Sequence, residues 1–318
     1  MQNILLLDWA KTMKILVTGG AGFIGSHITE YLVQRGDDIT VLDNLNTGQK
    51  RNLSKVNNNI NFVSGDIRDY KLLEGLVNDS DGVFHEAALA SVQQSFKMQD
   101  EYFDVNVNGT ENILKLAKKY GFKVVYASSS SVYGNPKHIP IKESNDRNPL
   151  NPYAKTKLED ELLAKKYSEM GVRVIGLRYF NVFGRRQSKE YAGVIKLFLE
   201  KIQQNKDPKI NGDGLQTRDF VYIEDVVKAN ILAMDSNIKH EFLNVGTGSS
   251  ISILDLANVC IEASGLSLKP THGPELPGDV KATEADTKLI EKLLNWKAKT
   301  KLENWLSEVI STKNFKDV

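Results

Sequence analysis

A tyrosine and a lysine one helical turn apart are the first residues in this sequence whose types and spacing suggest chemistry. Tyr153 and Lys157 lie in the stretch "NPYAKTKLEDE", and a helix over this stretch places both side chains on one face. A tyrosine phenol has a pKa of roughly 10, so it is a poor proton acceptor near pH 7. A neighbouring ammonium favours the phenolate and would let the tyrosine act as a base. The spacing is common by chance on amphipathic helices, so it gains weight only beside other motifs.

A run of four serines raises the question of whether one of them works with this pair. The run lies in "ASSSSVYG" (127–134), directly after the apolar stretch "KVVYA". A serine run is most often a solvated loop. Here it ends a predicted strand and precedes the Tyr-Lys pair, an arrangement that becomes specific once a dinucleotide-binding loop comes before both.

Such a loop is predicted near the start of the chain. The stretch "TGGAGFIG" contains Gly20-x-Gly22-x-x-Gly25 and also Gly19-x-x-Gly22-x-x-Gly25, between a predicted strand and a helical pattern. Glycines at this spacing allow a tight turn and let backbone N–H groups approach a pyrophosphate, which a helix N-terminus also favours. A glycine-rich turn without a ligand is the lesser alternative in this context.

Two acidic residues end the next predicted strands. Asp43 lies at the distance from the glycines where a carboxylate accepts hydrogen bonds from the adenosine ribose. A carboxylate there repels the 2′-phosphate of NADP, and no arginine directly follows, so NAD is the expected cofactor. Asp66 suits either the adenine edge or a simple turn, and both interpretations stay open.

The order of elements predicts the fold. Short β-branched strands alternate with helical patterns up to about residue 180, which is typical of an α/β fold with a parallel sheet covered by helices on both faces. We therefore predict a Rossmann-type, doubly wound parallel sheet in an NAD-binding domain at 13–180. A smaller, mainly substrate-binding lobe is expected at 181–318, with some interleaving, and a ligand in the crevice between the two. The predicted strands are 14–20, 38–43, 60–66, 82–88, 123–129 and 172–180.

Composition argues against several classes of function. Of 318 residues, 41% are hydrophobic and 25% charged, and the formal net charge of +1 gives no reason to expect nucleic acid or an anionic membrane surface as a partner. The single cysteine, Cys260, rules out an internal disulfide and lies in an apolar pattern typical of a buried residue. The five histidines are scattered without the spacing of a metal site, so we expect no metal.

The first twelve residues have no role that the sequence reveals. The apolar run at 4–7 is far too short to span a bilayer, and it precedes Asp8 without a small-residue cleavage site, which argues against a secretory signal. "MKILVTGG" at Met13 resembles a natural start, so residues 1–12 are either an extension or a misassigned start. A cytoplasmic protein is the expectation.

Taken together, these motifs resemble a known family. The chain contains, in this order, "TGGAGFIGSH", "VLDN", "GDIRD", "HEAA", "NVNGT", "SSSSVYG", "YAKTK", "LRYFNVFG" and "RDFVYIEDV". They are similar to motifs of the extended branch of the short-chain dehydrogenase/reductase family, and within it of the nucleotide-sugar 4-epimerases, over almost the whole chain from Met13. The resemblance implies that Ser129 hydrogen-bonds the sugar's 4-hydroxyl, that Tyr153 takes its proton, and that Lys157 holds the nicotinamide ribose.

The resemblance also implies binding residues and a partner. The residues expected to bind NAD are Gly19, Gly22, Phe23, Ile24, Gly25, Asp43, Asn44, Asp66, Ile67, Ala87, Ala88, Tyr153 and Lys157. The residues expected to bind the UDP-sugar are Ser91, Ser129, Ser130, Tyr153, Asn181, Val194, Lys209, Ile210, Arg218, Asp279 and Thr283. Helices around 95–120 and 152–169 form a paired-helix dimer in this family, so we expect a homodimer, although these faces could equally be solvated surface.

The expected reaction follows from what the serine segment lacks. Related 4,6-dehydratases and decarboxylases carry carboxylates where this chain has Ser130 and Ser131. Epimerisation needs only one hydride and one proton moved and returned, so the resemblance favours a 4-epimerase. Thr283 falls where related epimerases carry a gate residue beside the sugar, and a small gate leaves room for an N-acetyl group unless the threonine merely packs. UDP-GlcNAc and UDP-GalNAc are the expected substrates, with UDP-Glc and UDP-Gal as further candidates.

One departure and several alternatives stay open. Leu276 stands where the family usually has a second diphosphate-binding arginine, and leucine cannot pair with phosphate. Arg218 matches the first such arginine, unless it forms an ion pair with a neighbour. The alternatives on the same scaffold are a strict UDP-glucose 4-epimerase and a UDP-glucuronate epimerase or decarboxylase with Arg185 or Arg186 near C6. A non-catalytic NAD-binding sensor is the alternative of another class, although the intact Ser-Tyr-Lys set argues against it.

Overall fold

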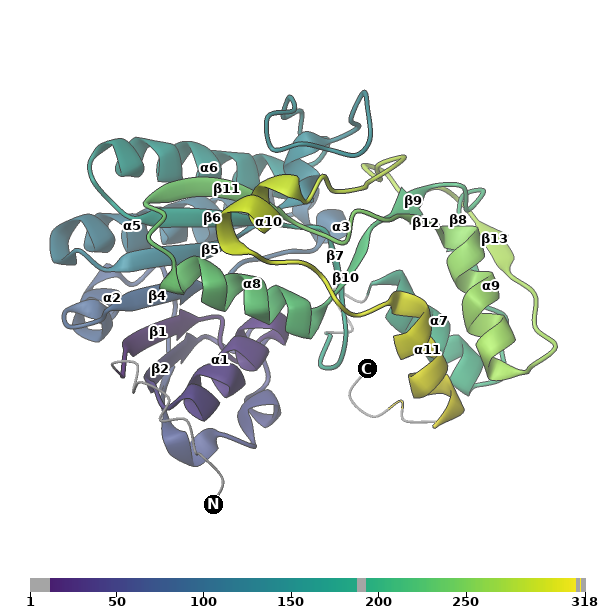
Figure 1. Cartoon of the computed structure of the whole chain (residues 1–318), viewed down its shortest axis with the longest axis horizontal. Helices are drawn as coiled ribbons and strands as arrows, with labels where there is room; N and C mark the ends of the chain where they lie inside the picture. The colour runs from purple at the N-terminus through teal and green to yellow at the C-terminus, as the bar shows by residue number, and fades with distance from the viewer. Residues whose placement is uncertain (1–11, 188–192, 313–314, 316–318) are drawn as a thin grey trace, which may run out of the picture.

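The computed structural model of the chain describes residues 12–187, 193–312 and 315, and the predictions for residues 1–11 lie outside this part. Figure 1 shows a large body built on a central sheet and a smaller lobe beside it. The chain passes from the first body to the second and back, because a late strand rejoins the sheet. Within the described ranges, no helix combines the length and the apolar character needed to cross a membrane.

The central sheet has seven parallel strands in the order β11-β6-β5-β4-β1-β2-β3. They are β1 (Lys14–Thr18), β2 (Asp38–Asp43), β3 (Ile60–Ser64), β4 (Gly82–His85), β5 (Lys123–Ser129), β6 (Val174–Tyr179) and β11 (His240–Val245). The order reverses between β1 and β4, where sheets of this kind bind their ligands. The predicted Rossmann-type, doubly wound parallel sheet is confirmed.

Helices cover both faces of the sheet (Figure 1). One face carries α2 (Tyr70–Val77), α5 (Gly109–Tyr120) and α6 (Pro152–Glu169), and the other carries α1 (Phe23–Arg35), α8 (Ile223–Asp235) and α10 (Lys288–Leu294). Each face of the sheet has its own hydrophobic core, and successive residues of β1 contribute to opposite faces. Leu16 packs on the α5 side and Val17 on the α1 side, and both are fully buried. Strands buried on both faces explain why the apolar runs in the sequence are nearly continuous.

Short helical segments connect β4 to α5. They are α3 (Val92–Ser95), α4 (Gln99–Tyr102) and a π-helical turn (Phe103–Asn108) that leads directly into α5. The fully buried Asn106 of this turn accepts the N–H of Leu89 at 2.8 Å and donates to the hydroxyl of Thr156 at 3.0 Å. Through these two hydrogen bonds of Asn106, the π-helical turn connects the loop after β4 to α6, the helix that carries Tyr153 and Lys157.

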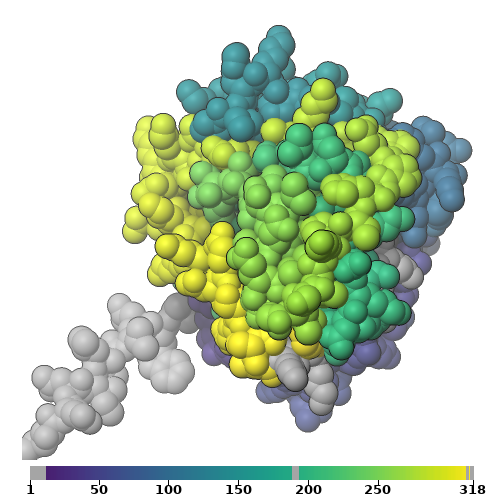
Figure 2. Space-filling view, turned by 90° about the vertical axis from the view of Figure 1, so that its right-hand side faces the viewer, coloured from purple at the N-terminus to yellow at the C-terminus, as the bar shows by residue number. Residues whose placement is uncertain are grey.

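The smaller lobe has a core of its own. Its helices are α7 (Val194–Gln203), α9 (Ile253–Ser264) and α11 (Leu302–Ser311), and its strands are β7 (Asn181–Phe183), β8 (Lys209–Asn211), β9 (Thr217–Arg218), β10 (Phe220–Tyr222), β12 (Ile251–Ser252) and β13 (Thr271–Gly273). Phe198, Leu256 and Leu306 are fully buried where α9 packs against α7 and α11. Figure 2 views this lobe end-on, with the green α9 beside the yellow α11.

The chain returns to the sheet after residue 180. β11 pairs in parallel with β6, from His240 opposite Val174 to Val245 opposite Tyr179. α8 and α10 complete the helical layer that α1 begins. The two parts of the chain therefore interleave in space, while the assignment of functions to 13–180 and 181–318 stays a prediction.

Several strands are shorter than predicted. The strand expected at 82–88 ends at His85, and the one expected at 60–66 ends at Ser64. The first strand ends at Thr18 because Gly19 adopts a φ of +67°, which turns the chain out of the sheet. The residues that follow these strand ends form loops at the carboxyl edge of the sheet. Short 3₁₀ turns lie at Lys50–Leu53, at Asn57–Asn59 directly before β3, and at Ser130–Tyr133 directly after β5.

Candidate active site

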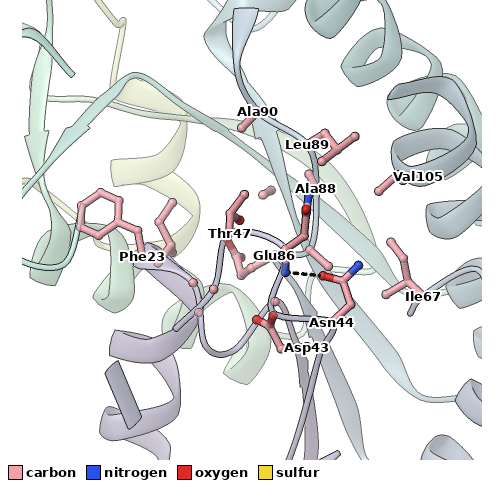
Figure 3. A pocket seen from close by; sticks show the side chains of 18 of the residues that line it. Phe23, Asp43, Asn44, Thr47, Ile67, Glu86, Ala88, Leu89, Ala90 and Val105 are labelled. Carbon is pink, nitrogen blue, oxygen red and sulfur yellow. Dashed lines mark hydrogen bonds between the residues drawn. The ribbon is translucent and has the colours of Figure 1, made fainter. Parts of the chain in front are cut away.

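A cavity of about 960 Å³ opens at the carboxyl edge of the sheet. Figure 3 shows side chains from separate segments around it, among them Phe23 at the start of α1 and Asn44 and Ala88 in the loops after β2 and β4. Every residue expected to bind NAD lines it: Gly19, Gly22, Phe23, Ile24, Gly25, Asp43, Asn44, Asp66, Ile67, Ala87, Ala88, Tyr153 and Lys157. The fold thus collects these dispersed residues in one place, while their individual roles stay predictions.

The glycine loop at this cavity has no room for side chains. A Cβ atom on Gly25 would lie 2.3 Å from the carbonyl oxygen of Gly19, and one on Gly19 would lie 2.6 Å from the backbone nitrogen of Ala87. α1 begins at Phe23 with Gly22 as its N-cap, and no side chain caps its first N–H groups. Open N–H groups at a helix N-terminus, reached over a surface of bare backbone, suit the pyrophosphate of a dinucleotide.

Two acidic residues also line the cavity. The carboxylate of Asp43 accepts the N–H groups of Ala21 at 2.9 Å and Leu45 at 2.7 Å, and burial raises the pKa of Asp43 in spite of these bonds. Asp66 pairs with Arg68, whose guanidinium lowers the pKa of Asp66 to about 2. Asp66 also accepts the backbone N–H of Arg68, so it serves as a turn residue while it faces the cavity.

The Ser-Tyr-Lys set lines the same cavity. Ser129 is the last residue of β5, and its hydroxyl oxygen accepts the N–H of Ser131 at 3.2 Å. Tyr153 lies in the first turn of α6, which the side chain of Asn151 caps, and Lys157 follows one turn later. A strand end and a helix start therefore bring these three side chains to one site from different parts of the chain.

A buried charge network behind the site holds these elements together. Glu161, fully buried on α6, accepts hydrogen bonds from Nε and Nη2 of Arg178 at 2.7 Å each, and one from the hydroxyl of Ser128 at 2.7 Å. Arg147 donates to the same carboxylate at 3.1 Å. A buried network whose charges are paired holds its members in a defined geometry. The sequence analysis missed Glu161, although its place four residues after Lys157 puts it on the same helix face.

The surroundings of Lys157 are unusual for a buried lysine. Its Nζ lies 3.2 Å from Oδ2 of Asp160, and both side chains are buried. Burial has the largest single effect and lowers the pKa of Lys157, but the charges of Asp160, Tyr153 and Glu86 and the hydrogen bond to Asp160 together outweigh it, so the pKa is raised. Glu86 also lines the cavity; burial raises its pKa to about 7, against a hydrogen bond from the hydroxyl of Tyr179 at 3.0 Å. Neither carboxyl group was expected, because spacing alone does not distinguish a buried carboxylate from a solvated one.

Comparison with known proteins identifies the family. The sequence profile of the NAD dependent epimerase/dehydratase family matches residues 15–246. The chain belongs to this family. The family expected from the motifs is therefore confirmed, and NAD is the cofactor. The glycine loop and the uncapped start of α1 fit that cofactor.

Three known proteins illustrate the range of similarity. The UDP-glucose 4-epimerase of Thermotoga maritima, solved with UDP-glucose, has a TM-score of 0.90 and 34% identity, covering 95% of this chain and 99% of that one. The UDP-N-acetylglucosamine 4-epimerase of Methanobrevibacter ruminantium, solved with UDP-N-acetylmuramic acid, has a TM-score of 0.90 and 37% identity, covering 95% and 98%. The UDP-N-acetyl-alpha-D-glucosaminuronate decarboxylase of Bacillus cytotoxicus is 38% identical over 268 residues, 82% of this chain and 83% of that protein.

The residues expected to bind the sugar nucleotide are more dispersed than those for NAD. A second cavity of about 210 Å³ adjoins the first and shares Phe180, Val182 and Gln187 with it. Asn181 and Val194 line this second cavity. The expected residues outside the lining of both cavities are Ser91, Ser130, Lys209, Ile210, Arg218, Asp279 and Thr283. Across the described ranges, no group of three or more His, Cys, Asp or Glu side chains could hold a metal ion.

Arg218 and Asp279 pair with each other in this structure. Arg218 is 7% exposed and also donates to the carbonyl of Thr217 at 2.7 Å. A diphosphate would therefore have to replace Asp279 as its partner. Leu276, which stands in place of the second arginine, is 41% exposed and offers no charge.

Ile210 and Thr283 are both buried in the packing of the lobe. β8 turns Lys209 outward and Ile210 inward, so the isoleucine side chain is fully buried and only its backbone could reach a uracil. Thr283 is 5% exposed, and its hydroxyl accepts the N–H of Asp219 at 3.3 Å. The expected gate role of Thr283 gains no support from this position and stays a prediction.

Proposed function

We propose that this chain is an NAD-dependent 4-epimerase of UDP-sugars, an isomerase. The observation that carries the proposal is the meeting of Ser129, Tyr153 and Lys157 in the cavity that the glycine loop lines. A hydroxyl, a phenol and an ammonium at one site can move one proton to and from a sugar hydroxyl. The neighbouring Ser130 and Ser131 add no acid, so this segment offers nothing for an elimination.

Each of the three residues has a distinct task in this proposal. Tyr153 takes the proton of the sugar's 4-hydroxyl and later returns it, and the ammonium of Lys157 favours the phenolate. Because the N–H of Ser131 already donates to the hydroxyl oxygen of Ser129, the serine's own proton is free to point at the sugar. NAD, when bound, accepts and returns the hydride at C4 of the sugar. Between the two proton transfers the 4-keto sugar must present its other face to the same residues.

Within this proposal the substrates are UDP-GlcNAc and UDP-GalNAc. The similarity to the UDP-N-acetylglucosamine 4-epimerase of M. ruminantium supports this choice. The small size of Thr283 supports it only indirectly, since that side chain packs against the backbone of Asp219. Activity on UDP-glucose and UDP-galactose is the second candidate, favoured by the equal TM-score of the T. maritima enzyme.

A uronic-acid substrate ranks below these two. It needs a cation near C6, and Arg186 was one candidate for that task. Its guanidinium donates to Glu30 at 2.5 Å and to the hydroxyl of Ser26 at 3.2 Å, so its charge is already balanced by a carboxylate on α1. The B. cytotoxicus decarboxylase keeps this alternative worth an assay.

We further propose a homodimer formed through α5 and α6. Large apolar side chains are exposed on or beside these helices: Phe103 at 48%, Leu162 at 46% and Met170 at 47%. A contiguous apolar patch marks an interface, whereas apolar side chains exposed singly are common on any surface, so the oligomeric state itself must be measured. Light scattering tests the proposal: a dimer mass that falls to a monomer mass in Leu162→Glu supports it, and a monomer mass in the unchanged protein contradicts it.

The activity itself is tested by product analysis. The purified protein is incubated with UDP-GlcNAc without added NAD, and the products are identified by proton NMR. UDP-GalNAc would establish both 4-epimerisation and a retained cofactor. Conversion of UDP-glucose alone would move the substrate assignment to the second candidate, and loss of CO₂ from a UDP-uronate would move it to a decarboxylase. Failure on all three with NAD supplied would leave a non-catalytic NAD-binding sensor, or activity on another nucleotide sugar, as the better account.

A further inference from the structure

The buried Asp219 connects three residues that are expected to bind the sugar nucleotide. It lies in the turn between β9 and β10, directly after Arg218, and it is 0% exposed. Its carbonyl oxygen accepts the N–H of Asn181 at 2.9 Å, and its own N–H donates to the hydroxyl of Thr283 at 3.3 Å. The backbone of this one residue therefore fixes its neighbours from both sides.

The side chain of Asp219 reaches two further segments. Oδ1 accepts the N–H and the hydroxyl of Thr247 at 2.8 and 2.6 Å, and Oδ2 accepts the N–H groups of Gly248 and Ala285 at 3.0 Å each. All four groups donate, so a side chain with two accepting oxygens satisfies all of them. Because an N–H that loses its acceptor inside the protein is costly, these bonds hold both segments to the β9–β10 turn.

Both segments belong to the larger body of the molecule. The first follows β11 at the edge of the central sheet, and the second, which contains Ala285, leads to α10. Ala285 shares a small buried core with Tyr133, in the 3₁₀ turn that follows Ser129. The hydrogen bonds of Asp219 therefore connect Arg218 in the smaller lobe to the serine segment in the larger body.

We propose that Asp219 is a positioning residue that fixes Arg218 relative to the Ser129 segment, so that a diphosphate held by Arg218 places its sugar at the proposed catalytic residues. The proposal deepens the proposed function and rests on it. Asp219 has no need to touch the ligand, because four donors already occupy its two oxygens. An amide in its place would present its own donors to two of these groups, and the turn that carries Arg218 would shift.

Calorimetry with UDP on the NAD-loaded protein tests this without turnover. Asp219→Asn keeps the size of the side chain but replaces one accepting oxygen with a donor. We expect its affinity for UDP to fall about tenfold or more, because a misplaced guanidinium loses charge-assisted hydrogen bonds to the diphosphate. Uridine has no phosphate, so its affinity, measured by ligand-observed NMR, should change by less than about twofold in the same variant.

Asp225→Asn is the matched control for lost stability. Asp225 on α8 is 8% exposed, and its Oδ2 accepts the N–H groups of Lys299 and Thr300 at 3.1 and 3.0 Å. These are bonds of the same kind, but Asp225 lies outside the lining of both cavities. The control should lower the midpoint of urea unfolding as Asp219→Asn does, yet leave the affinity for UDP within about twofold of the original.

A double-mutant cycle shows whether Asp219 acts through Arg218. In an Arg218→Gln background, Asp219→Asn should weaken UDP binding by less than about twofold further, because the guanidinium is already absent. An unchanged UDP affinity in folded Asp219→Asn, an equal loss for UDP and uridine, or a loss independent of Arg218 overturns the proposal. Asp219→Ser, which keeps one accepting oxygen, is measured in its place if urea unfolding shows that the asparagine variant is not folded. Failure of the unaltered protein to bind UDP would count against the proposed function, on which this proposal rests.

Discussion

The hydroxyl of Ser128 donates a hydrogen bond to Oε1 of Glu161 at 2.7 Å, and this contact joins the end of β5 to the middle of α6. Ser129 is the next residue on the strand, and Tyr153 lies two turns earlier on the helix. Arg178 on β6 binds the same carboxylate twice and completes the connection. The spacing between Ser129 and Tyr153, the proposed catalytic pair, therefore depends on buried residues behind them.

Replacing Glu161 with glutamine should destabilise the fold and slow turnover. Glutamine keeps the size of the side chain but leaves the buried guanidinium of Arg178 without its charge partner, a change that costs about 3–5 kcal/mol in other buried pairs. Urea unfolding measures the difference. Glu111→Gln is the control: its pair with Lys115 at 2.9 Å is partly exposed, so it should cost about 0.5 kcal/mol or less. Equal stability of the two variants would contradict the role given to Glu161.

Tyr153→Phe should lower kcat by about 10²–10⁴-fold and leave NAD content unchanged. The substitution removes the group that accepts the proton, while the glycine loop and Lys157 still line the cavity. Tyr120→Phe is the matched control, since it removes a hydroxyl from a partly exposed tyrosine at the end of α5. Steady-state kinetics and the absorbance of released cofactor measure both quantities. A Tyr153→Phe variant with more than a tenth of the original kcat would remove Tyr153 from the mechanism.

Gly25→Ala should abolish retention of NAD. Its Cβ atom would lie 2.3 Å from the carbonyl oxygen of Gly19, so the loop must move away from the place where a pyrophosphate would bind. Gly75→Ala on α2 is the control, because nothing lies within 4 Å of its added Cβ and alanine favours a helix by about 0.5–1 kcal/mol. Calorimetry measures the affinity of both variants for NAD. Unimpaired binding by Gly25→Ala would show that this loop does not hold the dinucleotide.

Glu86→Gln should stabilise the NAD-free protein more at pH 8 than at pH 5. Burial raises the pKa of Glu86 from 4.5 to about 7 in the folded state. The stability contributed by its neutral form is complete below the unfolded pKa and is lost as pH rises through about 7. Glutamine stays neutral, so the gain in free energy of unfolding should grow by about 1–2 kcal/mol between the two pH values, less than the full shift because the side chain lines an open cavity. Urea unfolding at both pH values checks this, and a gain independent of pH would contradict it.

Cys260 should resist alkylation until the lobe unfolds. It is fully buried on α9, and burial raises the pKa of the Cys260 thiol to about 12, so the reactive thiolate is scarce at pH 8. Because it is the only cysteine in the sequence, mass spectrometry after treatment with iodoacetamide counts its reaction directly. The native protein should stay unmodified while the urea-unfolded protein gains one adduct. Rapid modification of the native protein would mean that the core around α9 opens readily.

Local patterns were enough to predict much of the sheet and the NAD-binding side of the site. The glycine spacing after a strand and the Tyr153–Lys157 spacing on one helix turn are local properties, since residues close in sequence determine them. Parallel strands bring their carboxyl ends to one edge, so Asp43 and Ser129 could be assigned to a common site without coordinates. The structure places these residues around a single cavity.

Sequence patterns did not predict the contacts between segments that lie far apart in the chain. Whether Asp160 and Glu161 face solvent or a buried lysine and arginine depends on how α6 packs against β5 and β6 at once. The pairing of Arg218 with Asp279 depends likewise on a loop sixty-one residues away.

The sequence by itself determined the strand and helix order, the glycine loop and the Ser-Tyr-Lys set proposed for proton transfer, because each depends on a few neighbouring residues and a regular period. Only the tertiary structure decided which charges are buried, which are paired, and that β11 returns to close the sheet beside β6. The physical reason is that desolvation and ion pairing depend on every element packed around a group, and no single stretch of sequence contains that information.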